Sequence, residues 1–122
     1  MTEYDDRAGD PVLAVHTINN DEKYVSIFGR GKILGASVPD DTAVGAIAER
    51  VRRDGDKVPK IELNSGEIIW GCECWWMDAY RGEMWLMELK SVGYEIRDSV
   101  SITDMRKEYL EKEVEDGMDI DT

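Results

Sequence analysis

The residues that could do chemistry in this chain are aromatic and cationic. All four tryptophans fall between Trp70 and Trp85, and an indole face that stacks on a flat ring contributes about 1–3 kcal/mol per base. Arg30 and Lys32 stand in a glycine-rich segment whose backbone N–H groups and cations could cradle a phosphate. An aromatic face beside such a cradle is typical of a nucleotide-binding site. The candidate ligand-binding residues are Arg30, Lys32, Arg52, Arg53, Trp75, Trp76 and Arg81.

Each of these features also has a purely structural interpretation. Neighbouring residues of a strand point to opposite faces, so Trp75 and Trp76 cannot both enter one core. One of them could pack inside while the other lies under a helix or a second subunit, or offers its ring to a ligand. Any single cation could belong to an ordinary solvated face. Because the tryptophans face both sides of a strand, we expect a homo-oligomer, a dimer or larger.

Catalytic motifs are missing from the sequence. His16 is the single histidine, and there is no G-x-S-x-G, H-E-x-x-H or P-loop motif. His16 is interpreted as a half-buried structural residue rather than a base. A zinc site needs about four ligands, so we expect no metal. Because no catalytic motif is present either, we expect no cofactor and no enzymatic activity. Cys72 and Cys74 are either two reduced thiols or a redox pair, and their spacing suits a constraining disulfide poorly.

The charge excludes several classes of partner. With 15 Lys and Arg against 27 Asp and Glu, the net charge is −12, which disfavours DNA, RNA and anionic membranes. The acids concentrate at the two ends, so residues 11–107 hold 16 acids and 13 bases and could still form a local basic pocket. No apolar run approaches the roughly 18 residues of a membrane span, and residues 1–10 do not resemble a secretion signal. The expected location is the cytoplasm.

The elements that must position these residues follow from periodicity and turn chemistry. The sequence predicts a flexible acidic arm at 1–10, one domain at 11–115 and an acidic tail at 116–122. Strands are predicted at residues 12–18, 23–28, 59–63, 67–76 and 93–102, with turns at 19–22 and 64–66. Helices are predicted from a cap at Asp41 or Thr42 to residue 53, around residues 80–89, and from a cap at Thr103 or Asp104. This order predicts an α+β fold, a mostly antiparallel β-sheet with two to three helices packed on it.

Two strings of the sequence resemble a known family. They are KYVSIFGRGKILG (residues 23–35) and PKIELNSGEIIWGCECWW (residues 59–76). Both are similar to small phage and prophage proteins of the first Thoeris anti-defence family. Arg30 stands where a tyrosine is common in that family, and Met77 where a glycine is expected.

The resemblance implies a non-enzymatic viral sponge. Such a protein acts in the host cytoplasm and sequesters the cyclic ADP-ribose signal of a TIR-domain defence system. Some members bind cyclic oligonucleotides at a separate site. The assembly expected for this chain is a homo-oligomer, a dimer or higher, with a hexamer as one option. Two other classes stay open from the sequence alone. A small acidic protein could inhibit a host protein by direct binding, and the Cys-x-Cys pair could serve redox chemistry.

Overall fold

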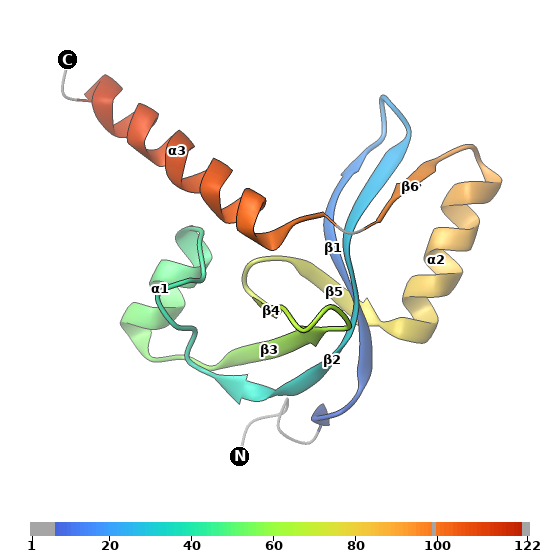
Figure 1. Ribbon diagram of the computed structural model, residues 1–122, viewed down its shortest axis with the longest axis horizontal. Coiled ribbons are helices and arrows are strands. Elements are labelled where there is room, and N and C mark those ends of the chain that lie inside the picture. Colours follow the sequence, from blue (N-terminus) through green and yellow to red (C-terminus); the bar gives the residue numbers. More distant parts are fainter. Residues whose placement is uncertain (1–6, 99, 121–122) are drawn as a thin grey trace.

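The computed structural model describes residues 7–98 and 100–120, with side chains up to residue 111, and shows an α+β fold. A mixed, mostly antiparallel sheet carries three helices within this part of the chain (Figure 1). The elements are β1 (Pro11–Asn19), β2 (Tyr24–Ser37), α1 (Ala46–Asp54), β3 (Val58–Leu63), β4 (Ile68–Trp70), β5 (Trp75–Asp78), α2 (Ala79–Ser91), β6 (Glu95–Arg97) and α3 (Ile102–Ile120). The strand order is β4-β3-β2-β1-β5, and β6 pairs in parallel with the start of β2.

Both predicted hairpins are present. Asn19 closes the first turn, where its side-chain oxygen accepts the backbone N–H of Glu22 at 2.9 Å. In the second turn, the N–H of Gly66 donates to the carbonyl of Leu63 at 2.8 Å. The strand after the first turn is longer than predicted, because β2 continues through its glycines as far as Ser37.

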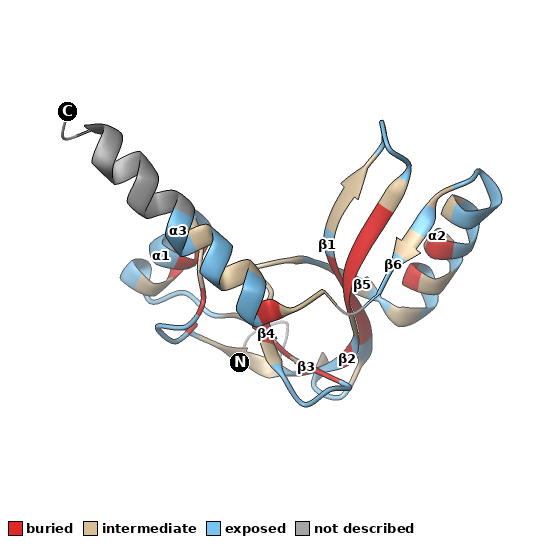
Figure 2. Ribbon diagram, turned by 45° about the horizontal axis from the view of Figure 1, so that its top comes forward, coloured by how far each residue is buried: buried red, intermediate tan, exposed pale blue. Residues whose placement is uncertain are grey.

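Buried apolar residues form clusters on both faces of the sheet, and Figure 2 marks the buried positions in red. On one face, α2 packs its Leu86 on a cluster formed by Leu13, Val15, Val25 and Ile27. On the other, Ile102 at the start of α3 joins a cluster formed by Val12, Ala14, Phe28, Ile33, Ile61, Leu63 and Ile69. Gly82 lets α2 approach β1 closely, because a Cβ there would lie 2.8 Å from the side chain of Leu13. This close approach explains a glycine inside a helix.

The strand predicted to run through residue 76 is interrupted, and this part of the prediction is wrong. Residues 71–74 form a turn between β4 and β5. The buried carboxylate of Glu73 holds the turn by accepting the backbone N–H of Trp70 at 3.1 Å and that of Val44 at 3.2 Å. Arg106 of α3 donates to the same carboxylate from Nη2 at 2.7 Å and from Nε at 2.9 Å. Glu73 therefore fixes the turn, the segment before α1 and the start of α3 together.

Other boundaries differ from the sequence prediction. Helix α1 begins after Gly45, because the side chain of Asp40 accepts the N–H of Thr42 in a separate turn before the helix. Helix α3 continues to Ile120, through residues assigned to the tail, and projects from the body (Figure 1). The predicted last strand is reduced to β6. None of the described helices combines the length and apolar character needed to cross a membrane.

The first described residues are attached to the sheet, although the sequence assigned them to an arm. Arg7 pairs with Asp10 and Asp78, and its guanidinium lies 5.3 Å from the ring centroid of Trp76. The N–H of Gly9 donates to the carbonyl of Ile33. The rest of the predicted arm, residues 1–6, lies outside the described residues.

Candidate functional site

A notch opens along one edge of β2, where its two partners on that edge separate. Residues 24–26 of β2 pair with β6, and residues 31–37 pair with β3. Between them, the carbonyl of Ile27 accepts the N–H of Val100 at 3.0 Å, and that of Arg30 accepts the N–H of Asn64 at 2.8 Å. Because none of the described strands covers this interval on that edge, a hollow of about 250 Å³ remains there.

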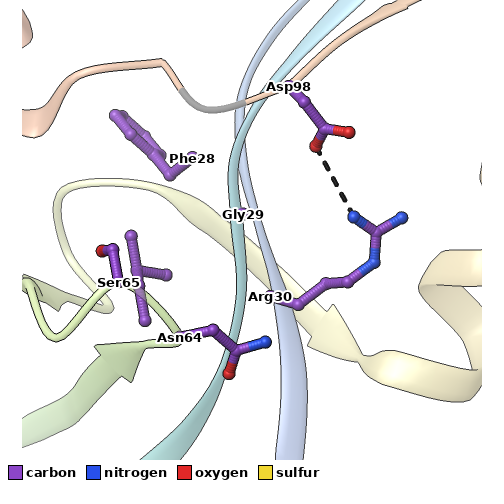
Figure 3. Close-up of a pocket in the computed structure, with 7 residues that line it drawn as sticks. Phe28, Gly29, Arg30, Asn64, Ser65 and Asp98 are labelled. Carbon is purple, nitrogen blue, oxygen red and sulfur yellow. Dashed lines mark ion pairs between the residues drawn. The ribbon is translucent and has the colours of Figure 1, made fainter.

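The notch is lined by residues from three separate parts of the chain. These are Phe28, Gly29 and Arg30 of β2, Leu63, Asn64 and Ser65 of the β3–β4 turn, and Asp98 after β6 (Figure 3). Gly29 has a φ of 137°, which strongly favours glycine, and the β1–β2 register shifts beside it. Figure 3 shows Phe28 and Ser65 on one side of the β2 ribbon and Arg30 and Asp98 on the other. A Cβ built on Gly29 would meet no atom within 4 Å, so the backbone of Gly29 borders open space.

Two carboxylates hold the guanidinium of Arg30. Glu83 of α2 accepts from Nε and, at 3.2 Å, from Nη2, while Asp98 lies 3.5 Å from Nη1. The hydrogen bonds to Glu83 raise the pKa of Arg30, and those from Arg30 lower the pKa of Glu83. All three side chains remain 42–55% exposed, so the arrangement is open to solvent and to a ligand.

A second hollow of about 250 Å³ adjoins the notch and shares Arg30 and Asp98 with it. Its other lining residues come from α2 and β6, and they are Glu83, Leu86, Met87, Lys90 and Ile96. Ligand pockets usually measure about 300–1,000 Å³, so each hollow alone suits only a fragment of a nucleotide. Together, the notch offers a polar half and the second hollow a more apolar half, on either side of the Arg30–Asp98 pair.

The structure does not gather the other predicted cations at the notch. Lys32 lies two residues further along β2 and pairs with Glu62 of the neighbouring strand β3 at 3.9 Å. Arg52 of α1 donates from Nη1 to the carbonyls of Asp40 and Ala43, both at 2.8 Å, which braces the turn before the helix. Arg53 pairs with the adjacent Asp54. Arg81 is exposed on α2 and makes no ion pair with another described residue.

The adjacent tryptophans have different environments, as the alternation of a strand predicts. Trp76 packs against the cluster around Val12 and Ala14, whereas Trp75 is 65% exposed. Trp75 and His16 line a separate hollow of about 310 Å³ beside the 71–74 turn. His16 is exposed rather than half-buried, with its ring edge-on to Phe28 at 5.2 Å between centroids. Trp70, in contrast, is buried, and Trp85 is partly buried against the cluster on the α2 side of the sheet.

The surroundings of the two cysteines disfavour their thiolate forms. Burial, together with the negative charge of Glu73, raises the pKa of Cys74 to about 12, and the same two causes raise the pKa of Cys72. Reactive thiols need a lowered pKa, so this environment disfavours redox chemistry. Over the residues that the structure describes, no three His, Cys, Asp or Glu side chains are grouped as metal ligands would be.

Sequence reasoning identified Arg30 but missed Asn64, Ser65 and Asp98. Asn64 and Ser65 were assigned only to a turn, and Asp98 reaches the notch only because β6 pairs with distant β2.

Comparisons of the chain with protein families, with curated proteins and with solved structures found no match.

Proposed function

We propose that this protein is a non-enzymatic viral sponge that binds a cyclic ADP-ribose isomer, or a related cyclic nucleotide, and keeps it from its receptor in the host cytoplasm. One observation carries the proposal. The two strings that resemble the Thoeris anti-defence family each supply three residues to the notch, Phe28 to Arg30 from the first and Leu63 to Ser65 from the second. Segments separated by more than twenty residues of sequence thus line the same hollow.

The chemistry of the notch supports binding without reaction. A hydrolase needs a nucleophile with a base in hydrogen-bond reach. The hydroxyl of Ser65 donates to Glu67 at 3.3 Å, but Glu67 is not among the described residues that line the notch, and His16 lines a different hollow. The remaining groups, Arg30, Asn64 and Asp98, are suited to hydrogen bonding and orientation.

Exposed apolar residues support a homo-oligomer, a dimer or a larger assembly. Tyr80, Met84 and Met87 form one stripe along α2, and Trp75 stands exposed on the adjoining strand. Large apolar side chains grouped on a surface mark interaction sites. The same stripe, on a chain of net charge −12, favours a second candidate function, inhibition of a basic host protein by direct binding.

The test is calorimetric titration with the cyclic ADP-ribose isomers made by a TIR-domain enzyme, followed by mass spectrometry of the ligand released by heat. We expect a dissociation constant near nanomolar, equivalent to about −12 kcal/mol, and recovery of the intact ligand. R30A should weaken binding and stay folded, because an exposed ion pair contributes only about 0–1 kcal/mol to stability. R53A, at an exposed arginine away from the notch, is the matched control.

Absence of binding, or recovery of a cleaved product, would refute the proposed function. If no nucleotide binds while a purified basic protein forms a salt-sensitive complex with the chain, the inhibitor function is favoured instead. An α2 variant, M87E, should then disrupt that complex.

A further inference from the structure

The charge balance at the notch conflicts with a phosphate site. Arg30 is the one cation among the described residues that line the notch, and two carboxylates, Glu83 and Asp98, already surround it. This trio carries a net charge of −1. A ligand phosphate at this point would meet two like charges within a few ångströms of a cation that is already paired.

The hydrogen-bonding groups of the notch match sugar hydroxyls instead. Asp98 is an acceptor, and the amide of Asn64 both donates and accepts while making no side-chain hydrogen bond to another described residue. Ser65 is held only loosely, with contacts to Glu67 of 3.3 and 3.4 Å. Vicinal hydroxyls also donate and accept, and hydrogen bonds from a hydroxyl to a carboxylate are short and strong.

The size and floor of the hollow agree with this chemistry. Its volume of about 250 Å³ suits a single ring, and Phe28 and Leu63 contribute an apolar floor. The adjoining hollow lies on the other side of the Arg30–Asp98 pair and is lined by Leu86, Met87, Ile96 and Lys90. Its apolar side chains suit the nucleobase of the ligand.

Building on the proposed function, we propose that the notch recognises the ribose hydroxyls of the nucleotide through Asp98 and Asn64, and that Arg30 is a positioning residue. Arg30, fixed by Glu83, holds Asp98 in place and does not bind phosphate. Recognition of the ligand then depends on its sugar edge, and its phosphates lie outside the notch.

The D98N variant distinguishes the two interpretations by the sign of its effect. If Asp98 accepts sugar hydroxyls, D98N should weaken binding of cyclic ADP-ribose at least tenfold. In D98N, a 2′-deoxy analogue that lacks the contacted hydroxyl should then bind nearly as tightly as cyclic ADP-ribose itself. If Arg30 binds phosphate, D98N removes a repulsive charge and affinity should rise. D54N, at an exposed aspartate on α1, is the matched control and should bind as the unmodified protein does.

A neutral probe tests the inference separately from the proposed function. Adenosine carries no phosphate, and we expect it to shift the NMR resonances of the Asn64 side-chain amide, whereas 2′,3′-dideoxyadenosine should not. Equal shifts with both nucleosides, or tighter binding of cyclic ADP-ribose by D98N, would overturn the inference. Failure of the unmodified protein to bind any cyclic ADP-ribose isomer, with adenosine still shifting Asn64, would refute the sponge function and leave sugar recognition standing.

Discussion

The ion pair between Glu73 and Arg106 offers a sharp test of how this fold is held together. The side chain of Glu73 is 0% exposed and that of Arg106 is 20% exposed. Among the described residues, replacing Arg106 by leucine leaves the carboxylate with the two backbone N–H groups of Trp70 and Val44 as its hydrogen-bond partners. Removing one partner of a buried pair costs about 3–5 kcal/mol. Because water reaches part of Arg106, we expect R106L to lose about 3 kcal/mol.

This loss should be measured by urea unfolding followed by far-ultraviolet circular dichroism. Against a usual total stability of about 5–15 kcal/mol, a change of 3 kcal/mol shifts the midpoint clearly. E73L should be destabilised as well, since it leaves the N–H groups of Trp70 and Val44 without their acceptor. The double variant should lose less than the sum of the two, with a coupling of about 0.5–3 kcal/mol.

The exposed Arg53–Asp54 pair provides the control. R53L should change stability by no more than about 0.5 kcal/mol, because both partners are solvated. If R106L behaves like R53L, or if the double variant is strictly additive, then Glu73 does not hold the turn and α3 together, and the explanation given for the interrupted strand fails.

Two further predictions concern the segment from Cys72 to Trp76. W76A should cost about 3 kcal/mol of folding free energy in the same urea assay, because Trp76 packs against the core. W75A should change stability by no more than about 0.5 kcal/mol, because Trp75 is exposed. Equal losses in the two variants would contradict this assignment. Iodoacetamide should modify Cys72 and Cys74 much more slowly at pH 8 in the folded protein than in urea, as followed by mass spectrometry. The raised pKa values of the two thiols leave less reactive thiolate in the folded protein at this pH. Equal rates would show that the thiols are exposed and have an unshifted pKa.

The sequence predicted the elements whose signals are local. Asn19 and the Asn64–Gly66 segment mark their turns by residue type, and both hairpins are present. The turn at 71–74 has no comparable local signal beyond one glycine, because Glu73 acts through Arg106 and Val44, which lie about thirty residues away on either side. Met77, noted as a departure from the family pattern, continues β5 and packs against the α2 side of the sheet.

The candidate site was predicted only in part for a similar reason. Glycines around Arg30 indicated a close approach to the backbone, and the notch lies there. Residue type alone could not show that Arg52 braces its own turn, or that Glu83 and Asp98 would neutralise Arg30. Those contacts depend on where α2 and β6 dock, and periodicity does not encode docking.

The parallel pairing of β6 with β2 has a consequence for the order of folding. The β1–β2 and β3–β4 hairpins join neighbours in sequence, whereas Tyr24 must find Glu95 across most of the domain. Closing a longer loop costs more chain entropy, so contacts of long sequence separation form slowly. Asp98 follows β6 directly, so the notch is complete only after this long-range pairing has formed. A folding intermediate that already holds both hairpins would therefore have most of its strands and no ligand site.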